Sequence, residues 1–356
     1  MLKMKYFVTC CLLILTACKV QAQIGGNYIY QFLNLPASAR ITALGGNLIT
    51  VKDDDVALAI ANPAALNSKM HNQISFSQDF HPSGINFGSL NYARHFKNWH
   101  GTTIQGGVQY ISYGTMQQTT PEGNVLGDFK ASEYLINLGV ARSFSEYLSL
   151  GVNWKTIMSY LGGYSSYGMA FDLAAMYSDT ASRVNVTLLM KNMGFQMTQY
   201  SPTSGREILP FEIQLGFSQR MKHAPFRYSI IAHQLQRWNV RYDDPALRDA
   251  RNIFGETQEP SNSKFKDGVD NFFRHLIFNV EALLGKREVL RLRIGYNYMH
   301  AREMRISNLR GLAGFTFGFG VKVSRLRIDY GFGAYHFAGS AHHFTLSTNL
   351  NEWIKK

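Results

Sequence analysis

The chain has 356 residues, of which 46% are hydrophobic and 13% aromatic, and its formal net charge is +12. Its mean hydropathy is −0.15, and no apolar run after residue 23 is long enough for a transmembrane helix, which excludes a helical membrane protein. The three cysteines, Cys10, Cys11 and Cys18, all lie near the N-terminus. Loss of that segment would leave no thiol for a disulfide, a metal site or a nucleophile.

Residues 1–22 read as a signal peptide. Lys3 and Lys5 precede a short apolar stretch over 6–17, and Val-Gln-Ala at 20–22 is a small-x-small cleavage site. We expect cleavage after Ala22. Lipidation at Cys18, which follows Leu-Thr-Ala, is the alternative, although a closed barrel gains little from a lipid anchor. Removal of this segment leaves a charge of +9, which either reflects scattered arginines or attracts acidic lipopolysaccharide or an acidic partner.

Residues 23–70 keep no hydrophobic period for long, although 57–61 could form a helical turn. We expect this segment to plug the lumen of a barrel or to close its periplasmic mouth. Within it, Asp53, Asp54 and Asp55 could ligate calcium, but the further spaced oxygens of a calcium loop are missing. We therefore interpret the three aspartates as a solvated turn.

Residues 71–356 alternate between apolar and small or polar side chains. In 315–323 every odd position is apolar, and in 287–299 leucine, isoleucine and tyrosine alternate with Arg291, Arg293 and Asn297. Such alternation gives a strand one apolar and one polar face. We predict an all-β fold, a transmembrane antiparallel β-barrel of about fourteen strands with an N-terminal plug segment. The predicted strands are 73–80, 85–95, 102–113, 128–144, 148–161, 164–177, 183–191, 211–221, 225–237, 271–283, 287–299, 312–323, 325–336 and 340–350.

The lengths of the connections favour a barrel over a soluble sandwich, whose core strands also alternate. Short connections at 145–147, 222–224, 284–286 and 324 fall between long ones. If the first strand starts in the periplasm, every long connection lies at the cell surface, as in outer-membrane barrels. We therefore expect an integral barrel of the cell outer membrane. The long connections are 114–127, 192–210, 238–270 and 300–311.

The connection 238–270 is the most polar part of the chain. Long connections of this kind are usually functional or disordered. We expect a surface loop that meets lipopolysaccharide or a partner protein. Its candidate partner-binding residues are Arg241, Asp243, Asp244, Arg248, Glu256 and Lys264.

No constellation for catalysis or metal binding stands out, so we predict neither an enzyme nor a cofactor. Ser261 and Lys264 match the Ser-x-x-Lys pattern of penicillin-binding enzymes, but they follow Pro260 in a polar loop and lack the companion motifs. His342 and His343 are adjacent on a predicted strand, so they face opposite sides and cannot share an ion. No glycine-rich phosphate loop follows a strand and precedes a helix.

The N-terminal segment resembles the PorQ family. The shared elements are Gln-Ile-Gly-Gly at 23–26, Tyr-Gln-Phe-Leu-Asn-Leu-Pro-Ala-Ser-Ala-Arg at 30–40, Ala-Leu-Gly-Gly at 43–46, the aspartates 53–55, and Ala-Asn-Pro-Ala-Ala at 61–65. The Ala-Arg, Leu-Gly-Gly and Asn-Pro-Ala elements are shared more loosely with PorV and with FadL-type fatty-acid channels. The signature residues are Pro36, Arg40, Gly45, Gly46, Asn62, Pro63 and Ala64.

The resemblance implies a FadL-like barrel of fourteen strands in the type IX secretion system of Bacteroidota. It implies a non-enzymatic role in the attachment complex, where such barrels hold a PorZ-like surface protein beside PorU-like and PorV-like components. Outer-membrane lipid and lipopolysaccharide would be further partners, and nucleic acid would not. The alternative is a FadL-type channel for hydrophobic small molecules.

Overall fold

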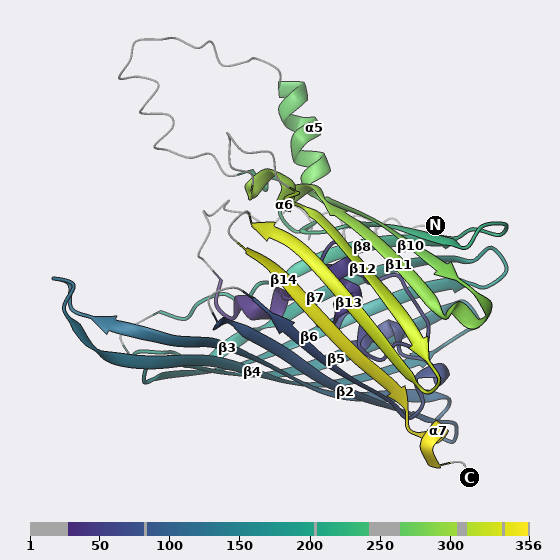
Figure 1. The fold of residues 1–356 in the computed structure, drawn as a ribbon, viewed down its shortest axis with the longest axis horizontal. Coiled ribbons are helices and arrows are strands. Elements are labelled where there is room, and N and C mark those ends of the chain that lie inside the picture. Colours follow the sequence, from purple (N-terminus) through teal and green to yellow (C-terminus); the bar gives the residue numbers. More distant parts are fainter. Residues whose placement is uncertain are drawn as a thin grey trace, which may run out of the picture.

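Fourteen strands form one closed antiparallel barrel, in which each strand pairs with its sequence neighbours and β1 pairs with β14 (Figure 1). This computed structural model confirms the predicted fold and all fourteen predicted strands. It describes residues 28–81, 84–202, 205–241, 264–304, 312–336 and 339–354. The strands are β1 Gln73–Phe80, β2 Asn86–Phe96, β3 Thr102–Thr119, β4 Val125–Ser143, β5 Leu148–Leu161, β6 Tyr164–Asp179, β7 Val184–Thr198, β8 Glu212–Arg220, β9 Phe226–Ala232, β10 Leu276–Leu284, β11 Leu290–Asn297, β12 Phe315–Val323, β13 Leu326–His336 and β14 Gly339–Asn349.

The predicted alternation separates the two faces of the wall. In β11, Leu292 and Ile294 are exposed on the outside, whereas Arg291 and Arg293 are buried inside. His343 likewise is buried in the lumen, while the neighbouring His342 lies outside against Tyr330. The period of two therefore predicted the direction of each side chain, because a strand has no other way to place successive residues.

The outer surface carries an apolar, aromatic belt. Across three neighbouring strands, the Tyr330 ring lies 5.5 Å from that of Phe319 and 5.1 Å from that of Phe344, between ring centroids. On the opposite wall, Leu138, Trp154 and Phe171 face each other across β4, β5 and β6 and are exposed. A closed barrel with such a belt satisfies its backbone internally and presents hydrocarbon to lipid. Within the described ranges, no helix has the length and apolar character that a membrane crossing requires.

Three predicted strand segments are wrong. Residues 233–237 form a connection, 271–274 belong to helix α5 (Lys264–Arg274), and 298–299 begin helix α6 (Tyr298–Glu303). The α6 helix starts because the Asn297 side chain caps it and accepts from the His300 amide at 3.2 Å. In addition, much of 114–127 is not loop, since β3 and β4 continue as a paired ribbon beyond the neighbouring strands (Figure 1).

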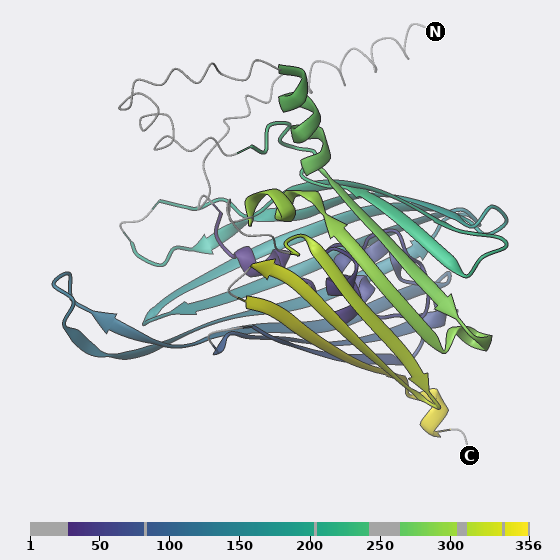
Figure 2. The same cartoon turned by 45° about the horizontal axis from the view of Figure 1, so that its top comes forward.

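The two mouths of the barrel differ. One carries short turns, such as 144–147 and 324–325, together with the start of β1 and helix α7 (Asn351–Ile354). The other carries the connections 233–275 and 298–314, with α5 and α6 standing above the barrel (Figure 2). Following the asymmetry of outer-membrane barrels, we call these the periplasmic mouth and the outer mouth.

The segment before β1 runs inside the barrel, as predicted for a plug (Figures 1 and 2). Helix α2 begins after Ser38, whose side chain accepts from the Ile41 amide at 3.4 Å. It packs against β11 to β14, while the short helix η2 packs against β4 to β6. The elements of the plug are η1 Gln31–Asn34, α2 Ala39–Ala43, α3 Leu58–Ala61, η2 Pro63–Ala65 and η3 Ser68–Met70, and η5 Lys286–Glu288 lies in a periplasmic turn.

Candidate functional site

The plug has little regular structure, so its buried backbone needs hydrogen-bond partners from elsewhere. The inward polar side chains of the wall provide them. The partners come from strands all around the barrel, which explains why the inner face is polar although it is buried. Wall side chains donate from Ser89 to the Ala37 carbonyl (2.8 Å), from Thr316 to that of Ala43 (2.9 Å), from Ser218 to that of Thr50 (2.9 Å), from Thr187 to that of Ile49 (3.1 Å) and from Asn153 to that of Ala59 (3.1 Å), while Thr345 accepts from the Ala39 amide (2.9 Å).

Glycines in the wall let the plug come close. A Cβ atom on Gly295 would lie 2.2 Å from the amide nitrogen of Gly45, and one on Gly318 would lie 2.5 Å from Cβ of Ala43. On the other side of the lumen, a Cβ on Gly151 would lie 2.4 Å from the backbone of Pro63. These glycines serve close backbone approach.

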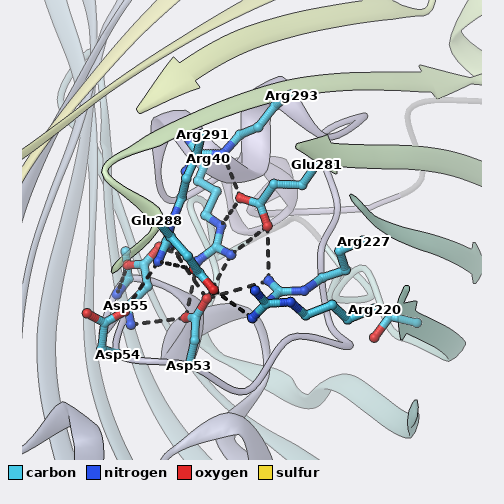
Figure 3. Close-up of polar contacts among 12 residues, drawn as sticks. Arg40, Asp53, Asp54, Asp55, Arg220, Arg227, Glu281, Glu288, Arg291 and Arg293 are labelled. Atoms are coloured by element: carbon cyan, nitrogen blue, oxygen red, sulfur yellow. Dashed lines mark hydrogen bonds and ion pairs between the residues drawn. The ribbon is translucent and has the colours of Figure 1, made fainter. Parts of the chain in front are cut away.

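Arg40 is the centre of an ion network at the base of the plug (Figure 3). Its buried guanidinium donates to Asp53 at 2.8 Å, to Asp55 at 3.2 Å and to Glu281 of β10 at 2.9 Å. Three carboxylates around one guanidinium satisfy its donors in fixed directions. The α2 helix is thereby tied both to the aspartate turn and to the wall.

Wall arginines extend this network around the lumen (Figure 3). Glu281 also accepts from Arg227 at 3.0 Å and from Arg293 at 2.9 Å, and Arg327 donates to Asp54 at 2.9 Å. We call the residues Arg40, Asp53, Asp54, Asp55, Arg227, Glu281, Arg293 and Arg327 the plug latch. Breaking a buried pair by removing one partner costs about 3–5 kcal/mol, because the other charge stays buried.

The latch shifts the pKa values of its aspartates in opposite directions. Burial would raise the pKa of Asp53, but the guanidiniums of Arg40, Arg291 and Arg227 hold it well below its usual range. Burial raises the pKa of Asp55 above its usual value, although Arg40 opposes this. The interpretation of 53–55 as a solvated turn is therefore wrong: the three carboxylates face cations inside the barrel.

A second buried polar cluster lies on the opposite wall. Lys155 of β5 donates to Asp172 at 2.8 Å and to the Asn192 side chain at 2.9 Å. The Asn192 amide group also donates to the Pro210 carbonyl at 3.0 Å, which ties the connection after β7 to the wall. This cluster keeps charge compensated within the strands themselves, and Asn192 also donates to the Asn34 side chain of the plug at 3.4 Å.

A cavity of about 450 Å³ lies between the plug and the outer mouth. Apolar plug residues such as Leu33 and Ile41 line it together with Met299 of α6. Its polar side holds Glu212, whose carboxylate lies 3.5 Å from Nδ1 of His233. Burial, and then the neighbouring His233, lower the pKa of His300 at the α6 side to about 4, so its imidazole is neutral near pH 7. The volume is in the range of small-molecule sites.

Helices α5 and α6 are joined above the outer mouth. Asp270 accepts from Arg274 at 2.8 Å and from the Tyr298 hydroxyl at 2.8 Å, and Arg302 lies 3.0 Å from the same carboxylate. Beside them, Trp238 stacks on His275 and is 65% exposed. We call α5, α6 and Trp238 the outer cap.

The predicted signature residues all lie in the plug. Pro36, Gly45 and Gly46 line the cavity between the plug and the outer mouth, which we call the outer cavity. Arg40 is the centre of the latch. Asn62 caps η2 by accepting from the Ala64 amide at 2.9 Å and also donates to the Ile49 carbonyl at 2.6 Å. Pro63 and Ala64 contact the wall at Gly151.

Of the predicted partner-binding loop, only the ends can be placed. Arg241 lies 2.7 Å from Asp267 of α5, and Lys264 begins that helix. Asp243, Asp244, Arg248 and Glu256 lie outside the described residues.

Sequence reasoning missed the wall partners of the latch, above all Glu281, Arg227 and Arg327. The available signal was charge on the inward face of predicted strands, which was visible for Arg291 and Arg293. In the described ranges, no group of three or more histidine, aspartate or glutamate side chains is arranged to hold a metal ion.

The fold resembles solved outer-membrane channels at low sequence identity. The toluene transporter TbuX of Ralstonia pickettii matches with a TM-score of 0.51 and 10% identity over 89% of this chain and 99% of that one. The toluene transporter TodX of P. putida (TM-score 0.50, 11% identity, 88% and 99%) and the monoaromatic hydrocarbon channel CymD (0.50, 12%, 88% and 96%) match similarly. No protein-family model and no curated protein matches the sequence.

These comparisons concern the fold. Together with the closed barrel of fourteen strands, the plug and the outer belt, they define the chain as an integral outer-membrane β-barrel of FadL-like architecture. Its predicted fold class and location are thus confirmed.

Proposed function

We propose that this barrel is a non-enzymatic outer-membrane component of a type IX secretion system. The portion of the barrel at the cell surface anchors a PorZ-like protein of the cargo attachment complex. The PorQ-like signature in residues 23–66 supports the assignment, and the observation that carries it is the latched plug. A scaffold needs a rigid, closed barrel, and the plug is tied to strands around the wall by backbone acceptors and buried ion pairs.

The outer cap offers the partner a fixed surface. Asp270 holds α5 against α6, so the exposed side chains of Trp238 and Phe272 keep their positions without further ordering. Aromatic residues held in place are typical anchors of protein interfaces. The segment 243–264, which the sequence predicts as a partner-binding loop, belongs to the proposed dock.

Affinity purification of the intact barrel from outer membranes, followed by mass spectrometry of proteins and lipids, tests the proposal. We expect one surface protein at stoichiometric amounts and little bound lipid. Deletion of 243–264 should release that protein while the barrel keeps its heat-modifiable gel mobility. A partner that stays bound shows that this loop is not the dock. A barrel that purifies alone contradicts the scaffold.

The second candidate is a channel for hydrophobic small molecules, and the outer cavity is the observation that favours it. The solved structures named above include toluene transporters and a monoaromatic hydrocarbon channel, and the cavity has an apolar side formed by the plug. A channel also requires the plug to move. Co-purified fatty acid or aromatic compound, lost when Met299→Gln makes the apolar side polar, would support this function. Met197→Gln, on an exposed side chain of β7, is the matched control.

A further inference from the structure

A charged basin lies at the periplasmic mouth, where part of the latch lines it. Its volume is about 510 Å³, and all ten of its lining residues are charged. They come from the plug, from η5 and from the periplasmic ends of β8, β9 and β11 to β13. Seven are cationic and three are acidic, so the formal charge of the lining is +4. We call it the cationic basin; it is formed by Lys52, Asp53, Asp54, Lys69, Arg220, Arg227, Glu288, Arg291, Lys322 and Arg327.

The acidic residues of the basin are already paired with arginines. Asp53 binds Arg40 at 2.8 Å, Asp54 binds Arg327 at 2.9 Å, and Glu288 binds Arg220 at 2.6 Å. Behind the lining, Arg40 adds one positive charge and Asp55 and Glu281 add two negative charges. A net charge of +3 remains, so the basin attracts anions.

Three lysines of the basin are weakly compensated by acidic groups among the described residues. Lys69 is exposed and its side chain makes no hydrogen bond or ion pair there, and Lys322 forms a long ion pair with Glu352 at 3.8 Å. Lys52 donates to the neutral Ser149 hydroxyl, and burial lowers its pKa. An anion in the basin would compensate these lysines.

Arg291 is the strongest sign of a missing acceptor. Its side chain is 5% exposed, and Nε and Nη1 have no hydrogen-bond acceptor among the described residues. The closest carboxylate oxygen to Nη1 belongs to Asp53, at 3.7 Å, while Nη2 donates to Glu288 at 3.1 Å. Guanidinium donors without an acceptor are costly to bury, and the Arg291 side chain also lines the basin.

The lining also decides the chemical class of the ligand. Acyl chains and aromatic rings find no apolar side chain in its lining, and a divalent cation would meet an excess of positive charge. We propose that the cationic basin binds a small, multiply charged anion bearing phosphate or carboxylate groups, with Lys52, Lys69 and Lys322 at its rim and Arg291 at its base. This site faces the periplasm and does not depend on the proposed surface partner.

Calorimetric titration of the full-length barrel in detergent tests this site, with tripolyphosphate and citrate as probes at constant ionic strength. We expect saturable binding of one or both. The double variant Lys69→Gln, Lys322→Gln should weaken it about threefold to tenfold, since two partly screened charge contacts are lost. Tighter binding of tripolyphosphate assigns phosphate, and tighter binding of citrate assigns carboxylate.

The double variant Lys97→Gln, Lys222→Gln is the matched control. Both lysines are exposed in turns at the same mouth but outside the basin, so the net charge changes equally. Equal weakening in both double variants would mean general attraction to a basic surface and would overturn the site. Absence of saturable binding would do the same. Tighter binding of a hexaglutamate peptide than of either probe would overturn the assignment to a small anion.

Discussion

The two ends of the plug are held to the barrel by different kinds of interaction. Helix α2 is fixed to β10–β13 by the latch, in which charges of both signs are buried together. Helix η2 is fixed to β4–β6 by close packing at Gly151 and by donation from Asn153 to plug carbonyls. Both ends approach the wall closely and hydrogen-bond to it, but only the α2 end also depends on buried ion pairs.

This difference predicts how each end responds to damage. Buried ion pairs are strongly interdependent, because loss of one partner leaves an uncompensated charge. Removing one hydrogen bond from a packed backbone contact costs less free energy, because the remaining contacts persist. The α2 end should be the first part of the plug to detach.

The largest effect is expected from Arg40→Ala. The change leaves Asp53, Asp55 and Glu281 without their shared guanidinium and should destabilise the plug by about 3–5 kcal/mol. Planar-bilayer recordings should show ion conductance absent from the unmodified barrel. Arg183→Ala, in an exposed periplasmic turn, is the control. Equal conductance in both variants would show that Arg40 does not hold the plug.

Gly295→Val should displace the plug next most strongly. Its Cβ would lie 2.2 Å from the Gly45 nitrogen, so the chain after α2 must move, at a cost of about 1–3 kcal/mol. Limited proteolysis should cut the plug faster. In Gly106→Val the new Cβ would lie 3.9 Å from its nearest neighbour, Leu138, and proteolysis should stay unchanged. A plug equally protected in both variants would contradict the close approach.

Asn62→Ala tests the η2 end. The variant loses the helix cap and the donation to the Ile49 carbonyl, which together should cost about 1–2 kcal/mol. Hydrogen exchange should rise around η2 and remain unchanged around α2. Exchange that rises equally at α2 would show that the two ends detach as one unit.

The smallest effect is expected from Arg241→Ala. Its pair with Asp267 is largely exposed, so its loss should change the stability of the barrel by less than about 1 kcal/mol. The thermal transition of heat-modifiable mobility should coincide with that of the unmodified protein. A shift as large as that of Asn62→Ala would mean that the outer cap supports the barrel.

Strand identity and the direction of side chains were predictable because they depend on a local period. Arg291 and Leu292 differ in environment because they are neighbours in one strand, and no distant residue changes that. The ends of strands were less predictable. The Asn297 side-chain cap starts helix α6, although Tyr298 is compatible with either a strand or a helix.

The amino-acid sequence by itself determined a fourteen-stranded barrel with an apolar exterior, a polar interior and an irregular N-terminal segment. Only the tertiary structure decided what the charged residues do. Arg40 and Glu281 lie 241 positions apart, so their contact depends on how the closed barrel places β10 beside α2. The same closure turned 53–55 from an expected solvated turn into counter-ions that are buried or partly buried, because the barrel wall brings arginines from distant strands against them.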